Sequence, residues 1–331
     1  MSTKDKVLLD LEKRKGVPVS GTIIANKLGV SRTAVWKAIN ALRAEGHVIK
    51  GGSGIGYVLD QKSDVLSEAG ISDQLSEHIA LHVFEEIDST NKEAKRLAIS
   101  EPSEPLLIIA DRQTEGRGRF GRSFYSPSGT GLYMSLLFRP EFSADRAGLA
   151  TAAASVAVCR AAKEVAGRQC GIKWVNDVYY NGKKICGILT EGVTGIESKT
   201  IDYMVIGIGI NCHPADISGK AGDRAGNLGG GFSRNDMAAA VVNELLPLIR
   251  ELDPRQFMDE YRSASIVIGE DIRIFGSGIS NRMTDPSQTD SGIPAHVTGI
   301  TDQAGLMVVY ADGRRETLTS GEITIRKDIK S

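Results

Sequence analysis

The sequence predicts an α+β protein of several domains, because three kinds of pattern follow one another along its 331 residues. Short helices and a glycine-rich hairpin come first, then strands with tight glycine turns together with an alanine-rich helix, then short strands alone. A chain of this length holds two or three domains with a real core. We place the domains at residues 1–62, 63–265 and 266–331.

The first domain has the element order of a winged helix-turn-helix. Apolar spacing and glycine turns predict helices at residues 6–15, 20–28 and 32–45 and a hairpin at residues 47–59. Ser31 is a suitable N-cap for the third helix. The expected buried stripe of that helix is Val35, Trp36, Ile39 and Leu42.

The third helix is placed to enter a DNA major groove. Residues 1–60 hold seven Lys and three Arg against two Glu and three Asp, a local positive excess that favours phosphate contacts. The residues expected to bind DNA are Ser31, Arg32, Thr33, Lys37 and Lys50. The helix carries few cations, so a small domain for protein contacts or autoinhibition is the alternative.

The middle domain follows a polar linker, residues 61–77, which has room for one short helix. Its predicted strands are residues 82–87, 105–110, 132–138, 172–174, 178–180, 184–190 and 204–210. Its predicted helices are residues 91–99, 146–165 and 233–252. Several of these strands join through tight glycine turns, which favours a mixed or largely antiparallel sheet over repeated βαβ units.

The last domain changes to short strands and is expected to be a small all-β module. The predicted strands are residues 266–268, 271–275, 295–300, 306–310 and 323–326. Residues 276–292 form a polar insertion that we expect to be mobile, and we assign it no role.

Composition excludes several classes of protein. Total charge is balanced, with 40 Lys+Arg against 41 Asp+Glu, so it indicates no class of partner. The start of the chain lacks the apolar core of a signal peptide, and no apolar run approaches the ~20 residues of a membrane span. The spacing of the four cysteines favours reduced thiols over disulfides or zinc. We therefore expect a cytoplasmic protein with no membrane partner.

A segment of three glycines and three arginines, residues 116–122 (GRGRFGR), is the densest chemical signal in the chain. Glycine allows a tight backbone around a ligand, and arginine presents a rigid fork to carboxylate or phosphate. The segment also matches the dinucleotide fingerprint G-x-G-x-x-G, which requires a helix directly after it. Residues 126–131 (SPSGTG) cannot begin such a helix, so we interpret the segment as an anion-binding loop.

Three further motifs could hold polar groups near that loop. Residues 88–91 (DSTN) open a helix and supply neutral donors and acceptors, although an ordinary N-cap would look the same. Residues 173–177 (KWVND) and 184–191 bring lysines and an aspartate onto neighbouring strands, where lysine can stabilise developing charge on phosphate. Residues 205–211 (VIGIGIN) form a strand whose glycines admit a flat group. No motif has metal-site spacing.

The ordered set of these motifs resembles the family of bifunctional biotin–protein ligases that also act as biotin operon repressors. Residues 299–306 and 320–323 fit the same pattern, so the resemblance covers nearly the whole chain. It implies an ATP-dependent biotin–[acetyl-CoA-carboxylase] ligase that forms biotinyl-5′-AMP and AMP. It also implies a class II synthetase-like central domain, a C-terminal SH3-like barrel and repression with biotinyl-5′-AMP as corepressor.

The resemblance carries roles to individual residues. Catalysis would rest on Arg117, Asp177 and Lys184. Biotin would be bound by Ser89, Thr90, Asn91, Gln113, Arg117, Gly118, Arg119 and Lys184. ATP and the adenylate would be bound by Phe124, Lys173, Asn176 and Asn211. Phe124 stands where the family commonly has Trp, which leaves a smaller stacking surface.

Mg²⁺ is expected with ATP, without identified ligands. The expected partners are a biotin carboxyl carrier domain, operator DNA and a second copy of the chain when adenylate is bound. Alternatives are a lipoate–protein ligase relative, a sensor that has lost catalysis, and a ligase whose winged domain no longer binds DNA.

Overall fold

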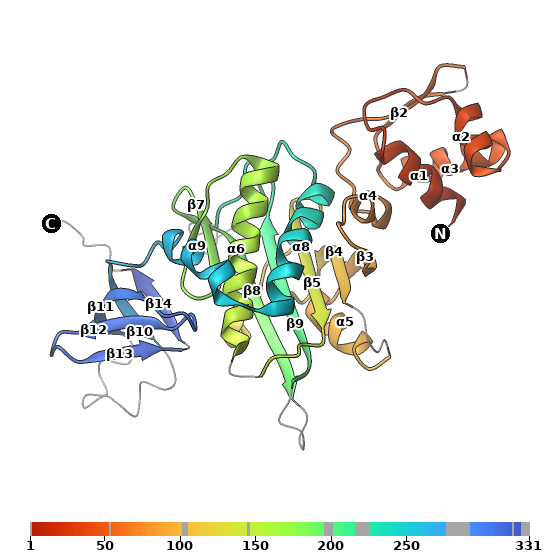
Figure 1. Ribbon diagram of the computed structural model, residues 1–331. Coiled ribbons are helices and arrows are strands. Elements are labelled where there is room, and N and C mark those ends of the chain that lie inside the picture. The colour runs from red at the N-terminus through yellow and green to blue at the C-terminus, as the bar shows by residue number, and fades with distance from the viewer. Residues whose placement is uncertain are drawn as a thin grey trace.

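The computed structural model describes residues 2–52, 54–100, 105–143, 146–194, 201–215, 225–275, 292–319 and 321–325. Figure 1 shows three bodies in chain order: a small helical domain, a central sheet covered by helices, and a separate β module. In the described residues, no helix is both long enough and apolar enough to cross a membrane.

The N-terminal domain is a helix-turn-helix followed by a hairpin, as predicted. Its elements are α1 (Thr3–Glu12), α2 (Gly21–Leu28), α3 (Arg32–Ala44), β1 (Ile49–Gly52) and β2 (Gly56–Leu59). The Ser31 hydroxyl accepts a hydrogen bond from the Ala34 amide, which confirms the cap. Gly29 ends α2 in the left-handed conformation, with φ of 65°.

Two expectations for this domain are wrong. Helix α1 begins and ends three residues earlier than predicted, because Ser2 and Asp5 form a capping box at its start. Trp36 does not join the buried stripe and is 53% exposed. It follows Val35 by one residue, hence by about 100° around the helix, and so faces away from the core side.

A seven-stranded mixed sheet forms the centre of the described molecule, in the order β3-β4-β5-β9-β8-β7-β6. Only β3 and β4 pair in parallel, which confirms the mixed sheet that the glycine turns predict. The strands are β3 (Ala80–Ile87), β4 (Leu106–Gln113), β5 (Gly131–Phe138), β6 (Gly171–Lys173), β7 (Asp177–Tyr180), β8 (Lys183–Thr194) and β9 (Ile201–Asn211).

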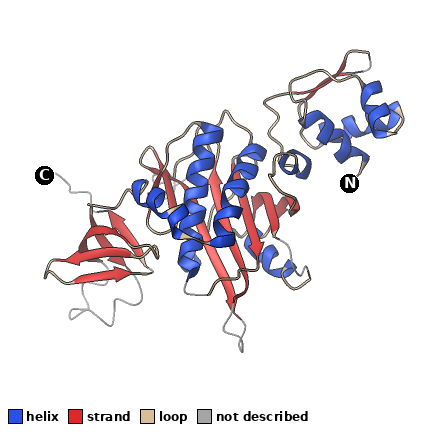
Figure 2. Cartoon of the chain, in the orientation of Figure 1, coloured by secondary structure: helices blue, strands red, loops and turns tan. Residues whose placement is uncertain are grey.

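Helices cover both faces of this sheet (Figure 2). One face packs against α6 (Ala147–Ala166) and α8 (Arg234–Glu251), whose alanine-rich contact buries the main core. The other face is covered at one end by α5 (Thr90–Leu97). Along β4, Leu107 and Ile109 join the first core while Leu106 and Ile108 join the second. Both faces of the strand are therefore buried, which explains its continuous apolar run.

A short helix, α4 (Glu68–Ser72), lies in the linker between the winged domain and the central sheet, as Figure 1 shows. The central domain ends with the turn η3 (Pro254–Gln256) and α9 (Met258–Ser263), which the sequence interpretation missed.

The C-terminal module is an antiparallel sheet in the order β13-β12-β11-β10-β14. Its strands are β10 (Asp271–Phe275), β11 (Ile293–Ile300), β12 (Leu306–Tyr310), β13 (Arg315–Leu318) and β14 (Glu322–Ile325). The strand expected at residues 266–268 is absent from these described residues, which form a turn from the central domain into β10. Strand β13 was not predicted. The expected mobile insertion lies outside the described residues, apart from Gly292.

Candidate functional site

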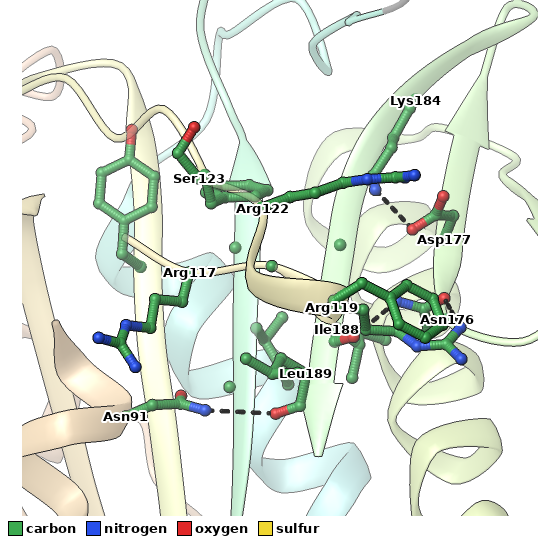
Figure 3. Close-up of a pocket in the computed structure, with 18 of the residues that line it drawn as sticks. Asn91, Arg117, Arg119, Arg122, Ser123, Asn176, Asp177, Lys184, Ile188 and Leu189 are labelled. Carbon is green, nitrogen blue, oxygen red and sulfur yellow. Dashed lines mark hydrogen bonds and ion pairs between the residues drawn. The ribbon is translucent and has the colours of Figure 1, made fainter. Parts of the chain in front are cut away.

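A cavity of about 190 Å³ lies over the sheet face opposite α6 and α8, beneath the glycine-arginine loop (Figure 3). The sequence-predicted residues that line it come from segments far apart in the chain. They are Ser89, Thr90, Asn91, Gln113, Arg117, Gly118, Arg119, Phe124, Lys173, Asn176, Asp177 and Lys184. The fold therefore brings all but one of the predicted ligand and catalytic residues to one place.

Two glycines of β9 form the floor of this cavity. The isoleucines that alternate with them pack into the main core, so Gly207 and Gly209 face the cavity. A Cβ on Gly207 would lie 2.1 Å from Asn91 Oδ1, and a Cβ on Gly209 would lie 2.6 Å from the Phe124 ring. Glycine is needed at both positions because neighbouring side chains occupy the space above the strand.

Neutral polar groups line one end of the cavity. The Thr90 amide donates to Gln113 Oε1 over 2.9 Å, and the buried Ser135 Oγ lies 2.8 Å from Thr90 Oγ1 and 2.6 Å from Asn91 Oδ1. Ser89 occupies the N-cap position of α5 but makes no capping hydrogen bond with its side chain. Neutral, preorganised donors and acceptors of this kind suit an uncharged polar head group better than an ion.

An acidic group fixes the orientation of Asn91. Its Nδ2 donates to Glu191 Oε2 over 2.8 Å and lies 3.4 Å from the Leu189 carbonyl oxygen. Glu191 also pairs with Lys95 at 2.6 Å. Burial raises the pKa of the Glu191 carboxyl, but hydrogen bonds from Lys95 and Asn91 outweigh it and hold this pKa below its usual value. Glu191 therefore stays ionised, which keeps the Asn91 carbonyl turned toward Ser135.

The glycine-arginine loop folds back on itself above the floor. The Gly118 amide donates to the Arg122 carbonyl over 2.7 Å, and the Phe124 amide donates to the Gly116 carbonyl over 2.8 Å. In Figure 3, Arg117 extends toward Asn91 while Arg122 extends toward the other side of the cavity. The loop thus distributes positive charge along the length of the site.

Arg119 joins the loop to two other parts of the chain. Its guanidinium donates to Asn176 Oδ1 over 3.0 Å and to the Gly321 carbonyl over 3.1 Å. Gly321 and Ile323 also line the cavity, so the C-terminal module forms part of its wall.

A lysine–carboxylate pair stands at the far side of the cavity. Lys184 Nζ lies 2.6 Å from Asp177 Oδ1, and both side chains are partly exposed (Figure 3). Beside them, Asn176 Nδ2 donates to the Ile188 carbonyl over 2.8 Å. The lysine and the aspartate neutralise one another. A phosphate that attracts Lys184 would release the aspartate for a second task.

Asn211 is the predicted site residue that the fold places elsewhere. It ends β9, its Nδ2 donates to the Gly226 carbonyl over 2.8 Å, and it lines a neighbouring cavity with Tyr125, Lys183 and His213. Its present hydrogen bond supports a loop rather than the main cavity.

The residues predicted to bind DNA lie together on the winged domain. Arg32, Thr33 and Lys37 are exposed on α3, and Lys50 on the hairpin is ion-paired with Asp60. A groove runs between the start of α2, the start of α3 and the hairpin. It is lined by Ser20, Gly21, Thr22, Arg32, Thr33, Trp36, Gly52, Gly54, Gly56 and Tyr57.

Arg122, Ser135 and Glu191 lie at this site without an individual role in the sequence prediction. Arg122 lines the cavity, Ser135 bridges Thr90 and Asn91, and Glu191 orients Asn91. Ser135 did leave a signal, because it is the one serine or threonine in a buried, mostly apolar strand, and a buried hydroxyl needs a partner.

The cysteines are free, and burial raises the pKa of the thiol to about 11 at Cys170 and about 12 at Cys212. Such thiols are poor nucleophiles and poor metal ligands. In the part of the chain that the structure describes, no group of His, Cys, Asp and Glu could hold a metal ion.

Comparisons with known proteins agree with this geometry. Residues 83–211 match the Biotin/lipoate A/B protein ligase family, and residues 4–58 match a helix-turn-helix domain. The bifunctional ligase/repressor BirA of Bacillus subtilis is 38% identical over 253 residues, covering 74% of this chain and 77% of that protein. BirA of Bacillus spizizenii is 35% identical over 318 residues, covering 94% of this chain and 96% of its own length.

A solved structure shares the fold over three quarters of this chain. The biotin protein ligase from Aquifex aeolicus in complex with biotin and ATP is 29% identical, with a TM-score of 0.60. The match covers 75% of this chain and 99% of that one.

Proposed function

Since the chain belongs to the BirA family of bifunctional ligase/repressors, it is a biotin–protein ligase with a DNA-binding repressor domain, and we propose how its cavity performs the reaction. The observation that carries the proposal is the order of groups along the cavity. Neutral donors and acceptors stand at one end, the loop arginines are distributed along the length of the cavity, and the Lys184–Asp177 pair stands at the other end (Figure 3).

Biotin binds with its uncharged ureido head among Ser89, Thr90, Asn91 and Gln113. This placement follows from the neutral character of that end and from the hydrogen bonds that already orient its groups. The valeryl chain then runs past Gly207 and Gly209, whose missing Cβ atoms let Asn91 and the Phe124 ring pack directly on β9. Its carboxylate reaches the region between Arg117 and Lys184.

In the first half-reaction, a biotin carboxylate oxygen attacks the α-phosphorus of ATP. A carboxylate–phosphorus bond forms, the bond from the α-phosphorus to the bridging oxygen breaks, and pyrophosphate leaves. Two anions must approach one another, so Arg117, Arg119 and Lys184 offset their repulsion and stabilise charge on the phosphorus oxygens. Gly118 lets the loop backbone approach the carboxylate and phosphate closely.

In the second half-reaction, the ε-amine of the acceptor lysine attacks the carbonyl carbon of biotinyl-5′-AMP. An amide bond forms, the bond from the acyl carbon to the phosphate oxygen breaks, and AMP leaves. Lys184 turns to the phosphate oxygens, which frees the Asp177 carboxylate to hydrogen-bond and orient the incoming amine. The two residues thus work in turn.

ATP lies on the side of the cavity that holds Phe124, Lys173 and Asn176. The Phe124 ring stacks on the adenine, Lys173 and Asn176 contact the adenylate, and Asn211 contributes after exchanging its bond to the Gly226 carbonyl.

Mg²⁺ accompanies the ATP phosphates in this proposal. Among the described residues that line the cavity, Asp177 is the only carboxylate. That sparse donor set fits an ion held mainly by phosphate and water, which is the usual mode for Mg²⁺. The ion would supply charge neutralisation on the leaving pyrophosphate.

Biotinyl-5′-AMP acts as the corepressor, and α3 with the hairpin contacts operator DNA. The exposed Trp36 joins Ser31, Arg32, Thr33, Lys37 and Lys50 in that contact. A homodimer forms when adenylate is bound, because winged domains of this class read two half-sites as pairs. We also propose domain bounds at residues 1–62, 63–265 and 266–331. The central domain is class II synthetase-like, and the C-terminal sheet closes into an SH3-like barrel.

The direct test incubates the chain with ATP, biotin and a biotin carboxyl carrier domain, followed by intact-mass measurement of the carrier. We expect one biotin per acceptor lysine and release of AMP. A lipoate–protein ligase relative would instead add lipoate in the parallel reaction. An unmodified carrier in the presence of all substrates would contradict the enzymatic proposal.

A further inference from the structure

A buried arginine outside the cavity joins parts of the chain that lie far apart in sequence. Arg234 stands in the first turn of α8, and its side chain is only 4% exposed. Nη1 donates to Asp111 Oδ1 over 2.6 Å and to the Gly131 carbonyl over 2.9 Å. Nε donates to Asp64 Oδ2 over 2.8 Å. A buried guanidinium is costly unless it is paired in this way, so each partner is firmly held.

Asp64 belongs to the linker that follows the winged domain. Its carboxylate accepts from the Arg234 side chain and, over 2.7 Å, from the Arg234 amide, and it lies 2.8 Å from His213 Nε2. Burial raises the pKa of the Asp64 carboxyl, but the hydrogen bonds from His213 and Arg234 hold it below its usual value. The linker is therefore attached to the ligase domain through an ionised carboxylate.

The residue before Asp64 is attached to the winged domain. Lys15 Nζ donates to the Ser63 carbonyl over 2.9 Å, and the Val48 amide donates to Ser63 Oγ over 3.1 Å. The linker thus contacts the winged domain at Ser63 and the central domain at the adjacent Asp64, and α4 after it packs on both. A connection of this kind has no slack, unlike a flexible linker.

The linker is also held after Asp64. The Ser67 amide donates to Asn235 Oδ1 over 3.1 Å, and Asn235 Nδ2 donates to the Val65 carbonyl over 3.0 Å. The first turn of α8 therefore holds both sides of this linker segment. Figure 1 shows the result, with α4 lying between the winged domain and the central sheet.

The opposite ends of this network reach the substrate cavity. Asp111 precedes Gln113 on β4 by two residues and also accepts from the Gly129 amide over 3.1 Å. The turn that contains Gly129 carries Ser126, whose hydroxyl accepts from Gln113 Nε2 over 3.0 Å. His213 follows β9 by two residues, and its amide donates to the Thr130 carbonyl of the same turn over 2.8 Å.

We propose that Asp64 and Arg234 are positioning residues that attach the linker of the winged domain (residues 61–77, the tether) to the wall of the ligase cavity. Occupancy of the cavity and the placement of the winged domain are then coupled through this network. The inference rests on the proposed function, because it takes biotin and ATP as the ligands of the cavity. Coupling is reciprocal. If ligand binding changes how the tether is held, then a change in the tether must change the affinity for the ligands.

The test compares Asp64→Asn with Asp60→Asn, the same chemical change four residues earlier. Asp60 is ion-paired with Lys50 and accepts from the Lys62 amide, so its replacement leaves the Asp64–Arg234 network intact. We expect Asp64→Asn to raise KM for biotin and ATP by roughly 5- to 150-fold, the usual range of coupling between sites. The effect on kcat should be smaller, because neither residue touches the reacting atoms. Equal KM values in the two variants would overturn the proposal.

A second measurement uses the wild-type chain, so it does not depend on whether a variant folds. Biotin and ATP together should slow hydrogen–deuterium exchange at the Ser67 and Arg234 amides, which donate within the network but do not line the cavity. Unchanged exchange at saturating ligand would count against coupling. Wild-type transfer of biotin to a carrier domain is measured first. If transfer is absent, the proposed function fails; if transfer occurs without protection, only this inference fails.

The third arm measures DNA binding, with a duplex selected from a random pool by the wild-type chain in the presence of biotin and ATP. Adding these ligands should tighten binding by the wild type and by Asp60→Asn. In Asp64→Asn we expect this gain to fall by at least about fivefold, the lower bound of site-to-site coupling. A gain equal to that of the wild type would show that the tether does not transmit occupancy.

Discussion

Replacing Gly207 by alanine tests the assignment of the biotin head group to one end of the cavity. Gly207 lies in the middle of β9 and pairs with Ser135 on β5 and Leu189 on β8. The new methyl group would lie 2.1 Å from Asn91 Oδ1 and 2.8 Å from Asn91 Cγ. Asn91 would have to withdraw by about an ångström, because a carbon–oxygen contact normally exceeds ~3 Å.

The energetic cost follows from what Asn91 would lose. Its Oδ1 is 2.6 Å from Ser135 Oγ and its Nδ2 is 2.8 Å from Glu191, and both contacts are part-buried or buried. Overpacking of a filled site costs about 1–3 kcal/mol. If that cost is expressed mainly in ligand binding, KM for biotin rises roughly 5- to 150-fold, because each ~1.4 kcal/mol is a factor of ten. The assay is biotin transfer to a carrier domain, together with calorimetric titration of biotin.

Two matched substitutions control this experiment. Gly192→Ala on β8 adds the same methyl group, but its nearest neighbours, Ile201 and Met204, are at 3.8 and 4.0 Å, so we expect wild-type kinetics. Gly209→Ala crowds the Phe124 ring at 2.6 Å and should raise KM for ATP more than KM for biotin. A Gly207→Ala enzyme that folds and keeps the wild-type affinity for biotin would refute the placement of the head group beside Asn91.

Three further predictions concern the arginine loop, the lysine and acid stability. Arg117→Ala should release biotinyl-5′-AMP about 10- to 100-fold faster, since a hydrogen bond to a charged group is worth about 1.5–3 kcal/mol. The control is Arg112→Ala, because Arg112 pairs with Glu86 outside the cavity. If Arg117→Ala and the wild type held biotinyl-5′-AMP for equal times, the role of Arg117 in retaining it would be contradicted. Lys184→Ala should slow pyrophosphate release about 10²- to 10³-fold with folding intact, as expected for loss of one charge-stabilising group, and normal release would exclude it. Burial lowers the pKa of His47, whose Nδ1 has no partner among the described residues. The unfolded chain therefore binds the proton more readily, so this residue should destabilise the winged domain as pH falls below about 6.5. Between pH 8 and 5, the melting temperature of His47→Phe should fall less than that of the wild type. Equal falls in the two proteins would rule this out.

Local patterns predicted the secondary structure where one physical signal dominated. Ser31 and Gly29 mark their helix ends correctly because capping depends only on neighbouring backbone groups. The predictions failed where the signal was not local. Trp36 was assigned to the core by its hydrophobicity, although its angular position on α3 turns it outward. Residues 266–268 form a turn instead of a strand, although the Ile266 amide donates to the Ile172 carbonyl of β6 over 2.9 Å.

The fold gathers most of the predicted site residues around one cavity, but the sequence did not specify their geometry. The motif order indicated that Thr90, Gln113 and Lys184 serve one ligand, and the fold gathers them around one cavity. The motif order could not show that the Asn211 side chain, at the end of β9, hydrogen-bonds the Gly226 carbonyl in a loop. It also could not find Glu191 as the partner of Asn91, because the two are 100 residues apart.

The sequence by itself determined the kinds of group available: a flexible cationic loop, a neutral polar turn, a lysine near an aspartate, and a helix-turn-helix at the start of the chain. Those properties depend on residue type and on spacing within a few positions. Only the tertiary structure decided which groups meet. It placed Gly207 under Asn91, tied Arg119 to Gly321, and anchored the linker at Asp64 to the buried Arg234. Contacts of that range are selected by the packing of the whole sheet and its helices, since the burial of each charge depends on partners that no local pattern specifies.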